Sequence, residues 1–257
     1  MDGRCGQSRQ SCEEFTLKRK QMISYRSLLE SVHDNIVGRE DIEWSNFWFD
    51  KANQDSKQRI LLVGDSTARM VRSRLAKALS LPVDLFGTSS GLHDALFCSQ
   101  IDAFFECGRR YDAIFVQLGN HSRINKNGDL YEATDYERYE RDLRALITFL
   151  QQFSERIILE TVFFCVHPLG AFSSWLEKVT RIKLEKYDET INCNTRRKNR
   201  AIMRVAADMH LELLDINDIM MKGNFMRVDH IHFERRAVHT IVGIMCKKLE
   251  EHKEQKI

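Results

Sequence analysis

The clearest structural signal in the chain is Ile60-Leu-Leu-Val-Gly-Asp-Ser-Thr67, in which four apolar residues run into a glycine and then into a polar turn. Such a short apolar run is typical of a strand that is buried on both faces of a parallel sheet. A helical pattern follows, from about Thr67 to Leu79. Ser66 is therefore predicted to stand where a strand passes into a helix.

The alternation of strand and helix continues along the chain. Further strands are predicted at residues 82–86, 111–118, 156–162 and 211–216, and further helices at about 92–107, 135–153, 195–209 and 234–253. This alternation predicts a parallel sheet with helices on both faces, right-handed crossovers and a flavodoxin-like strand order. We expect an α/β fold, a three-layer αβα sandwich around a mainly parallel five-stranded sheet.

Residues 1–57 differ in pattern from the domain predicted at 58–257. The stretch from Cys12 to Val37 is mostly helical in pattern, and residues 42–49 are rich in aromatic side chains. We therefore expect a helical N-terminal extension. Simple packing on the main domain is the favoured interpretation, and a surface that faces substrate or a partner is the alternative. The side chains that would make this contact are Trp44, Phe47, Trp48 and Phe49.

Length and composition exclude several classes of protein. The 257 residues suit one α/β domain, and the formal net charge of +2 gives no reason to expect a nucleic-acid partner. The N-terminus lacks the apolar segment of a signal peptide, and no apolar run is long enough to span a membrane, so we expect a cytoplasmic protein. The seven cysteines include no C-x-x-C pair, which argues against a zinc site or a disulfide framework. The oligomeric state is left open.

Ligands of such sheets bind beyond the carboxyl ends of the strands, so the residues after each strand are candidates for function. At a helix start, Ser66 would stand beside free backbone N–H groups that favour developing negative charge. A simple N-cap is the alternative for this serine. Asn120, after the third strand, has a side-chain amide that can donate to an oxyanion or hold a turn.

Asp229 and His232 lie three residues apart, between the fifth strand and the last helix. On a turn, this spacing can bring the carboxylate to imidazole Nδ1 and leave Nε2 to take a proton from a serine. His230 and His232 are also compatible with an exposed pair or a weak metal site, but no third ligand stands at a suitable spacing. Together the strand ends supply a nucleophile, oxyanion donors and an acid–base dyad, as acyl transfer requires.

At these positions the chain resembles the SGNH hydrolases, also called GDSL-type esterases and lipases, over about residues 58–250. The family blocks correspond to Gly64-Asp65-Ser66-Thr67, to Gly91, to Leu118-Gly119-Asn120-His121 and to Asp229-His230-Ile231-His232. The third block matches loosely, because the family usually has glycine where Leu118 stands and aspartate where His121 stands.

The resemblance implies that Ser66 is the nucleophile, that His232 is the general base and then acid, and that Asp229 orients His232. It implies a serine esterase that acts on a short-chain ester, with acetyl as the expected acyl group, a carbohydrate as the expected alcohol, and no metal or organic cofactor. An O-acyltransferase is the close alternative. A binding protein that retains the fold is the more distant one, and nucleotide binding is disfavoured because no phosphate-binding glycine motif is present.

The resemblance also implies an oxyanion hole. Its donors would be the backbone N–H groups of Ser66 and Gly91 and the side chain of Asn120, with Gly87 as the alternative to Gly91. The long stretch from Phe163 to Cys193 follows a strand end, and either walls the pocket or contains a surface helix at about 173–186. Further candidates for substrate contact are Asp65, His121 and His167.

Overall fold

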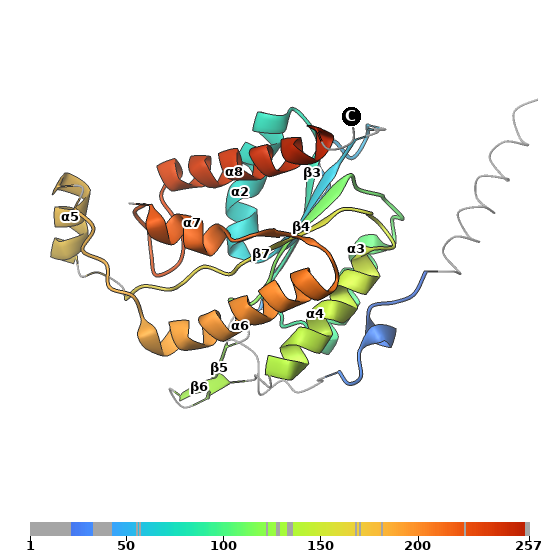
Figure 1. The fold of residues 1–257 in the computed structure, drawn as a ribbon, viewed down its shortest axis with the longest axis horizontal. Coiled ribbons are helices and arrows are strands. Elements are labelled where there is room, and N and C mark those ends of the chain that lie inside the picture. Colours follow the sequence, from blue (N-terminus) through green and yellow to red (C-terminus); the bar gives the residue numbers. More distant parts are fainter. Residues whose placement is uncertain are drawn as a thin grey trace, which may run out of the picture.

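The computed structural model describes residues 22–32, 43–54, 56, 58–121, 123–126, 129–132, 136–167, 169, 171–180, 182–223 and 225–254. Within these ranges the chain forms one central sheet with helices on both faces and a small separate hairpin (Figure 1). No helix in the described ranges combines the length and the apolar character that a bilayer crossing requires.

The central sheet has six strands in the order β1-β3-β2-β4-β7-β8. These are β1 (Ser45–Trp48), β2 (Ile60–Gly64), β3 (Val83–Thr88), β4 (Ala113–Gln117), β7 (Ile157–Glu160) and β8 (Glu212–Leu214). All pairings are parallel except that of β1 with β3. Without β1, the strands in chain order give the flavodoxin-like arrangement, which confirms the predicted fold class.

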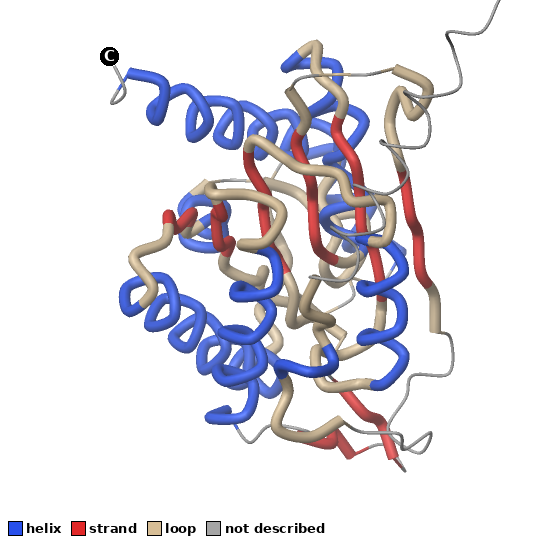
Figure 2. The backbone as a smooth tube through the Cα atoms, turned by 90° about the vertical axis from the view of Figure 1, so that its right-hand side faces the viewer, coloured by secondary structure: helices blue, strands red, loops and turns tan. Residues whose placement is uncertain are grey.

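Two helical layers enclose this sheet. The elements outside it are η1 (Arg26–Leu28), α2 (Ser66–Leu79), α3 (Ala95–Phe105), β5 (Arg123–Lys126), β6 (Asp129–Glu132), α4 (Tyr136–Leu150), α5 (Ala171–Thr180), α6 (Glu189–Asp208), α7 (Ile216–Lys222) and α8 (Arg235–Glu254). Helices α2, α7 and α8 cover one face, and α3, α4 and α6 cover the other (Figure 1). Figure 2 shows the strands side by side, with the β5–β6 hairpin apart from them.

Strand β2 shows why both faces are covered. Leu61 and Val63 belong to the core shared with α3, α4 and α6, whereas Ile60 and Leu62 belong to the core shared with α2, α7 and α8. Successive side chains of a strand point to opposite faces, so one apolar run serves two cores. The apolar run ends at the carboxyl end of β2, where the polar turn begins.

The aromatic segment before residue 50 is a strand, which differs from the expected helical extension. Phe47 stands opposite Phe86 in the antiparallel pair of β1 and β3, so the sheet has six strands rather than the predicted five. The Phe47 ring also packs on Phe86 and Phe104, with centroids 5.4 and 5.5 Å apart. Aromatic side chains favour such pleated, half-buried surfaces. The predicted boundary between residues 57 and 58 falls between β1 and β2 and stays a prediction.

Residues 22–32 hold a single turn of 3₁₀ helix, η1, where a longer helix was expected. Tyr25 fixes this segment, because its buried hydroxyl donates to the Leu92 carbonyl at 2.9 Å and its backbone N–H donates to Asp102 at 2.8 Å. Those contacts hold the segment against α3 without a helical repeat. The rest of the helix predicted from Cys12 to Val37 lies outside the described residues.

The stretch from Phe163 to Cys193 contains the surface helix that was one of the two predicted alternatives, as α5. Helix α6 begins at Glu189, earlier than the predicted Thr195, because Asp188 caps it by accepting the backbone N–H of Ile191 at 3.1 Å. Helix α7, which the sequence pattern did not predict, begins in the same way after the cap Asp215.

Candidate active site

Ser66 is the first residue of α2 and stands directly beyond the carboxyl end of β2. The N-cap of this helix is Asp65, whose Oδ1 accepts the Thr67 backbone N–H at 2.9 Å and the Thr67 hydroxyl at 2.7 Å. The alternative that Ser66 is merely the N-cap is therefore wrong. Because Asp65 satisfies the helix end, the Ser66 hydroxyl is left to face another partner.

Two hydrogen bonds join Ser66, His232 and Asp229 in one chain. His232 Nε2 lies 2.7 Å from Ser66 Oγ, and His232 Nδ1 lies 2.7 Å from Asp229 Oδ2. When Nδ1–H donates to the carboxylate, Nε2 accepts the serine hydroxyl, which is the orientation that proton removal from serine requires. The fold thus brings together the three residues that the sequence singled out.

A tight turn holds the Asp229 carboxylate in place. Its Oδ1 accepts the backbone N–H groups of Ile231 at 2.9 Å and His232 at 2.7 Å, while Oδ2 receives the imidazole. Partial burial opposes ionisation, but these two N–H donors and the imidazole outweigh it and lower the pKa of Asp229 below its ordinary value. Asp229 is therefore ionised at neutral pH and can stabilise a positive charge on His232.

Arg227, which sequence reasoning missed, lies buried under this turn. Its Nη1 donates to the Ile231 carbonyl at 3.1 Å, and its guanidinium lies over the Phe233 ring, 4.3 Å from the centroid. The Arg227 side chain also faces buried Glu185 at 3.7 Å, and Glu185 Oε1 accepts the Arg227 backbone N–H at 3.1 Å. No local motif marks this pair, because its members lie 42 positions apart.

Gly91, the candidate oxyanion donor, lies in the loop after β3. Its backbone N–H donates to the carboxylate of Asp94 at 2.7 Å. The alternative, Gly87, is the penultimate residue of β3 and stands between Gly64 and Asn46 of the neighbouring strands. A cavity of about 10 Å³, the size of one water molecule, lies beside Gly91.

Asn120 is buried, and its Nδ2 donates to Asp65 Oδ2 at 2.7 Å. Asp65 therefore lies beneath the site with both oxygens bonded inside the chain. Gly119 allows this geometry because its φ is +141°, and a Cβ there would lie 3.1 Å from Val162 Cγ2. The sequence identified Asn120 and Asp65 without indicating that they bind each other.

Leu118 and His121, the residues at which the third block departs from the family pattern, both make defined contacts. Leu118 is buried, and its carbonyl accepts the Tyr139 hydroxyl at 2.7 Å. The next carbonyl, of Gly119, accepts Lys198 Nζ at 2.8 Å. His121 is half-buried and meets the Trp44 ring edge to face at 6.0 Å. These contacts hold the loop that carries Asn120.

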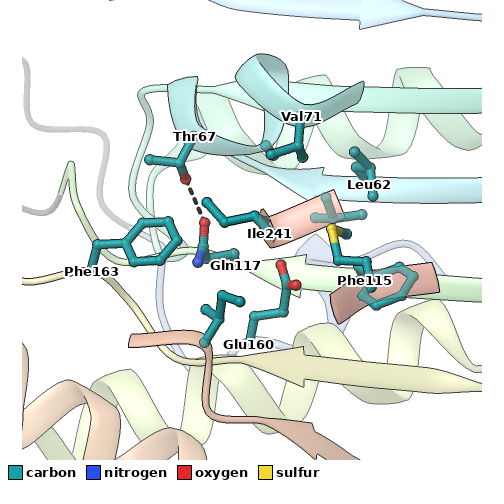
Figure 3. A pocket seen from close by; sticks show the side chains of 12 residues that line it. Leu62, Thr67, Val71, Phe115, Gln117, Glu160, Phe163 and Ile241 are labelled. Carbon is teal, nitrogen blue, oxygen red and sulfur yellow. Dashed lines mark hydrogen bonds between the residues drawn. The ribbon is translucent and has the colours of Figure 1, made fainter. Parts of the chain in front are cut away.

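A second cavity of about 10 Å³ lies between the sheet, α2 and α8 (Figure 3). The Thr67 hydroxyl reaches Gln117 at one end of it, and Glu160 points into it from β7 (Figure 3). Burial raises the pKa of Glu160 to about 8, and no described residue bonds its Oε1. Glu160 is therefore largely protonated at neutral pH.

His167 and His230 take no part in the hydrogen bonds that link Ser66, His232 and Asp229. The exposed His167 faces Asp188 at 3.7 Å rather than Ser66 or His232. His230 is exposed, while both ring nitrogens of His232 are occupied by Ser66 and Asp229. Across the described ranges, no three histidine, cysteine or acidic side chains gather as a metal site would require.

Comparison with solved structures identifies the fold class. The chain resembles a Slackia heliotrinireducens protein assigned to the SGNH hydrolases, with a TM-score of 0.52, 15% identity and coverage of 76% of this chain and 100% of that one. It also resembles a GDSL-like lipase from Bacteroides thetaiotaomicron, with a TM-score of 0.51, 12% identity and coverage of 76% and 89%. The chain therefore has the fold of the SGNH hydrolases. No protein-family model and no curated protein matches the sequence.

Proposed function

We propose that this protein is a serine esterase that removes a short acyl group from a carbohydrate ester, and that acetyl is its preferred acyl group. The observation that carries the proposal is the chain of 2.7 Å hydrogen bonds from Ser66 through His232 to Asp229. Its position beyond the carboxyl end of β2 agrees with where ligands bind in such sheets.

In this mechanism Ser66 Oγ attacks the ester carbonyl while His232 Nε2 takes the hydroxyl proton. His232 then protonates the departing alcohol, and an acyl-Ser66 ester is left. Water attacks this ester with His232 again as base, which releases the acid and restores the serine. Asp229 holds the imidazole and stabilises its positive charge throughout.

The oxyanion hole consists of the backbone N–H groups of Ser66 and Gly91 and of Asn120 Nδ2. The latter two donate to Asp94 and Asp65 in this structure, so each must turn toward the oxyanion as negative charge develops. The space of about 10 Å³ beside Gly91 fits one water molecule, so the choice of a short acyl group rests on the resemblance to the family. A cytoplasmic place of action stays a prediction from the sequence.

Hydrolysis of 4-nitrophenyl acetate tests the proposal. The wild type must release nitrophenol, and Ser66→Ala must lose almost all of this activity. Ser73→Ala is the matched control, because Ser73 is exposed on the same helix. Activity that survives in Ser66→Ala would refute the role given to this serine.

One observation favours a binding protein as the second candidate. The carboxylate of Asp94 occupies the Gly91 N–H that an oxyanion would need. A binding protein would bind acylated sugars without turnover, and its Ser66→Ala variant would bind them as well as the wild type does. Turnover with a sugar acceptor in place of water would indicate the acyltransferase instead.

A further inference from the structure

Two arginines on α2 stack on two tryptophans of the N-terminal segment. The Arg69 guanidinium carbon lies 5.2 Å from the centre of the Trp44 ring, and that of Arg72 lies 4.3 Å from Trp48. The arginines are three positions apart on one helix, and the tryptophans are four positions apart at either end of β1. The chain therefore carries the same pair twice, at two distances from Ser66.

The first pair lies at the functional edge of the sheet. β1 runs antiparallel to β3, with Ser45 opposite Thr88 at the carboxyl end of β3, so Trp44 lies at that end and Trp48 lies farther back. On α2, side chains three positions apart are surface neighbours, with Cβ atoms about 5–6 Å apart. Arg69 is thus the helical neighbour of Ser66.

The two guanidinium groups differ in how their charge is met. Arg72 lies 3.8 Å from the Asp50 carboxylate and donates to the Val83 carbonyl at 3.2 Å. Arg69 is exposed, and in the described part of the chain its guanidinium stacks on Trp44 without a hydrogen bond or an ion pair. Asp50 therefore neutralises Arg72, which lies away from the site, whereas no described side chain neutralises Arg69 beside Ser66.

Trp44 is a fixed platform for Arg69. Its backbone N–H donates to Ser89 Oγ at 2.9 Å, and its carbonyl accepts the Ser89 backbone N–H at 3.1 Å. The indole also meets the ring of His121, which follows Asn120 in the loop after β4. A stacked guanidinium keeps its N–H groups free at the rim of its plane, and their fork matches the two oxygens of a carboxylate.

We propose that Arg69, held over Trp44, binds a carboxylate of the substrate, so that the substrate is a short-chain ester of an acidic sugar. This inference rests on the proposed esterase and names its substrate class. The carboxylate would lie within about one sugar ring of the ester, because Arg69 and Ser66 are neighbours on the same helix turn. The N-terminal segment then contributes to specificity through Trp44.

The test compares two sugars that differ in one group, the acetylated methyl glycosides of glucuronic acid and of glucose. At low salt, wild-type kcat/KM for the acidic sugar must exceed that for the neutral sugar by about tenfold or more, as a charge-assisted hydrogen-bond pair allows. Arg69→Met, which keeps the side-chain stem, must bring the ratio close to one. Arg72→Met is the matched control and must keep the wild-type ratio.

A wild-type ratio near one, or a preference that persists in Arg69→Met, overturns the inference and leaves the esterase intact. If neither sugar is hydrolysed and simple acetates are also untouched, the proposed function fails as well. Titration of Ser66→Ala with the two sugars gives a readout without turnover. The acidic sugar must bind more tightly, and adding Arg69→Met must abolish the difference; equal binding of both sugars overturns the carboxylate site.

Discussion

The Asp94 carboxylate accepts the backbone N–H of Gly91 at 2.7 Å, so a negative charge stands where the proposed oxyanion would form. An oxyanion must compete with this carboxylate for the same donor and is repelled by its charge. Asp94→Ala should therefore raise kcat on 4-nitrophenyl acetate by about tenfold, the scale of one charged hydrogen bond. Glu106→Gln, just after the other end of α3, is the control. Unchanged or lower activity in a folded Asp94→Ala would exclude Gly91 as a donor.

Gly119 should be intolerant of a side chain. Gly119→Ala forces a residue with Cβ to a φ of +141° and toward Val162 Cγ2, and we expect it to cost about 1–3 kcal/mol of stability. It should also lower kcat by about tenfold or more, because the following Asn120 moves. Gly243→Ala on α8 is the control, since a Cβ there meets nothing within 4 Å. Equal kcat for the two variants would argue against the role of Asn120.

Arg227 is predicted to position the turn that carries His232. Arg227→Met leaves the buried Glu185 with Lys183, at 3.9 Å, as its remaining cationic neighbour and should destabilise the protein by about 2–3 kcal/mol. Adding Glu185→Gln should restore most of that stability. It should not restore kcat, because the Ile231 carbonyl still lacks its donor. If kcat recovers together with stability in the double variant, Arg227 has only a structural role.

Glu160 should make stability depend on pH. Its pKa is near 4.5 in the unfolded chain and is raised to about 8 by burial in the fold, so the unfolded chain gives up the proton first as pH rises. Stability from this group is full below about pH 4.5 and falls until about pH 8, by about 1.4 kcal/mol per pKa unit. In Glu160→Gln, urea unfolding should show a much smaller loss over this range. Glu155→Gln, an exposed neighbour, should behave like the wild type.

The sequence was sufficient for the parallel part of the sheet, because its strands are continuous apolar runs that serve two cores. It was also sufficient for Ser66, Asp229 and His232, since each occupies a short motif at a strand end. Strand β1 was not predictable from periodicity, because its pairing is decided by β3, which lies about forty positions further on.

Contacts between residues that lie far apart in the sequence were also not predictable from it. Arg227 meets Glu185 only because the segment before α6 returns to the turn before α8. The carboxylates on Gly91 and Asn120 likewise depend on side-chain directions that no motif encodes. Burial, rather than any neighbouring charge, sets the pKa of Glu160, and burial of a single side chain requires the packed fold.

Covalent labelling of Ser66 tests the central claim most directly. A fluorophosphonate forms a stable adduct only with a serine whose proton is removed by a neighbouring base. The account predicts a single adduct on the wild type, mapped by peptide mass to Ser66, with strongly slowed labelling in His232→Ala and none in Ser66→Ala. A wild-type protein that stays unlabelled, or an adduct on another serine, would contradict it.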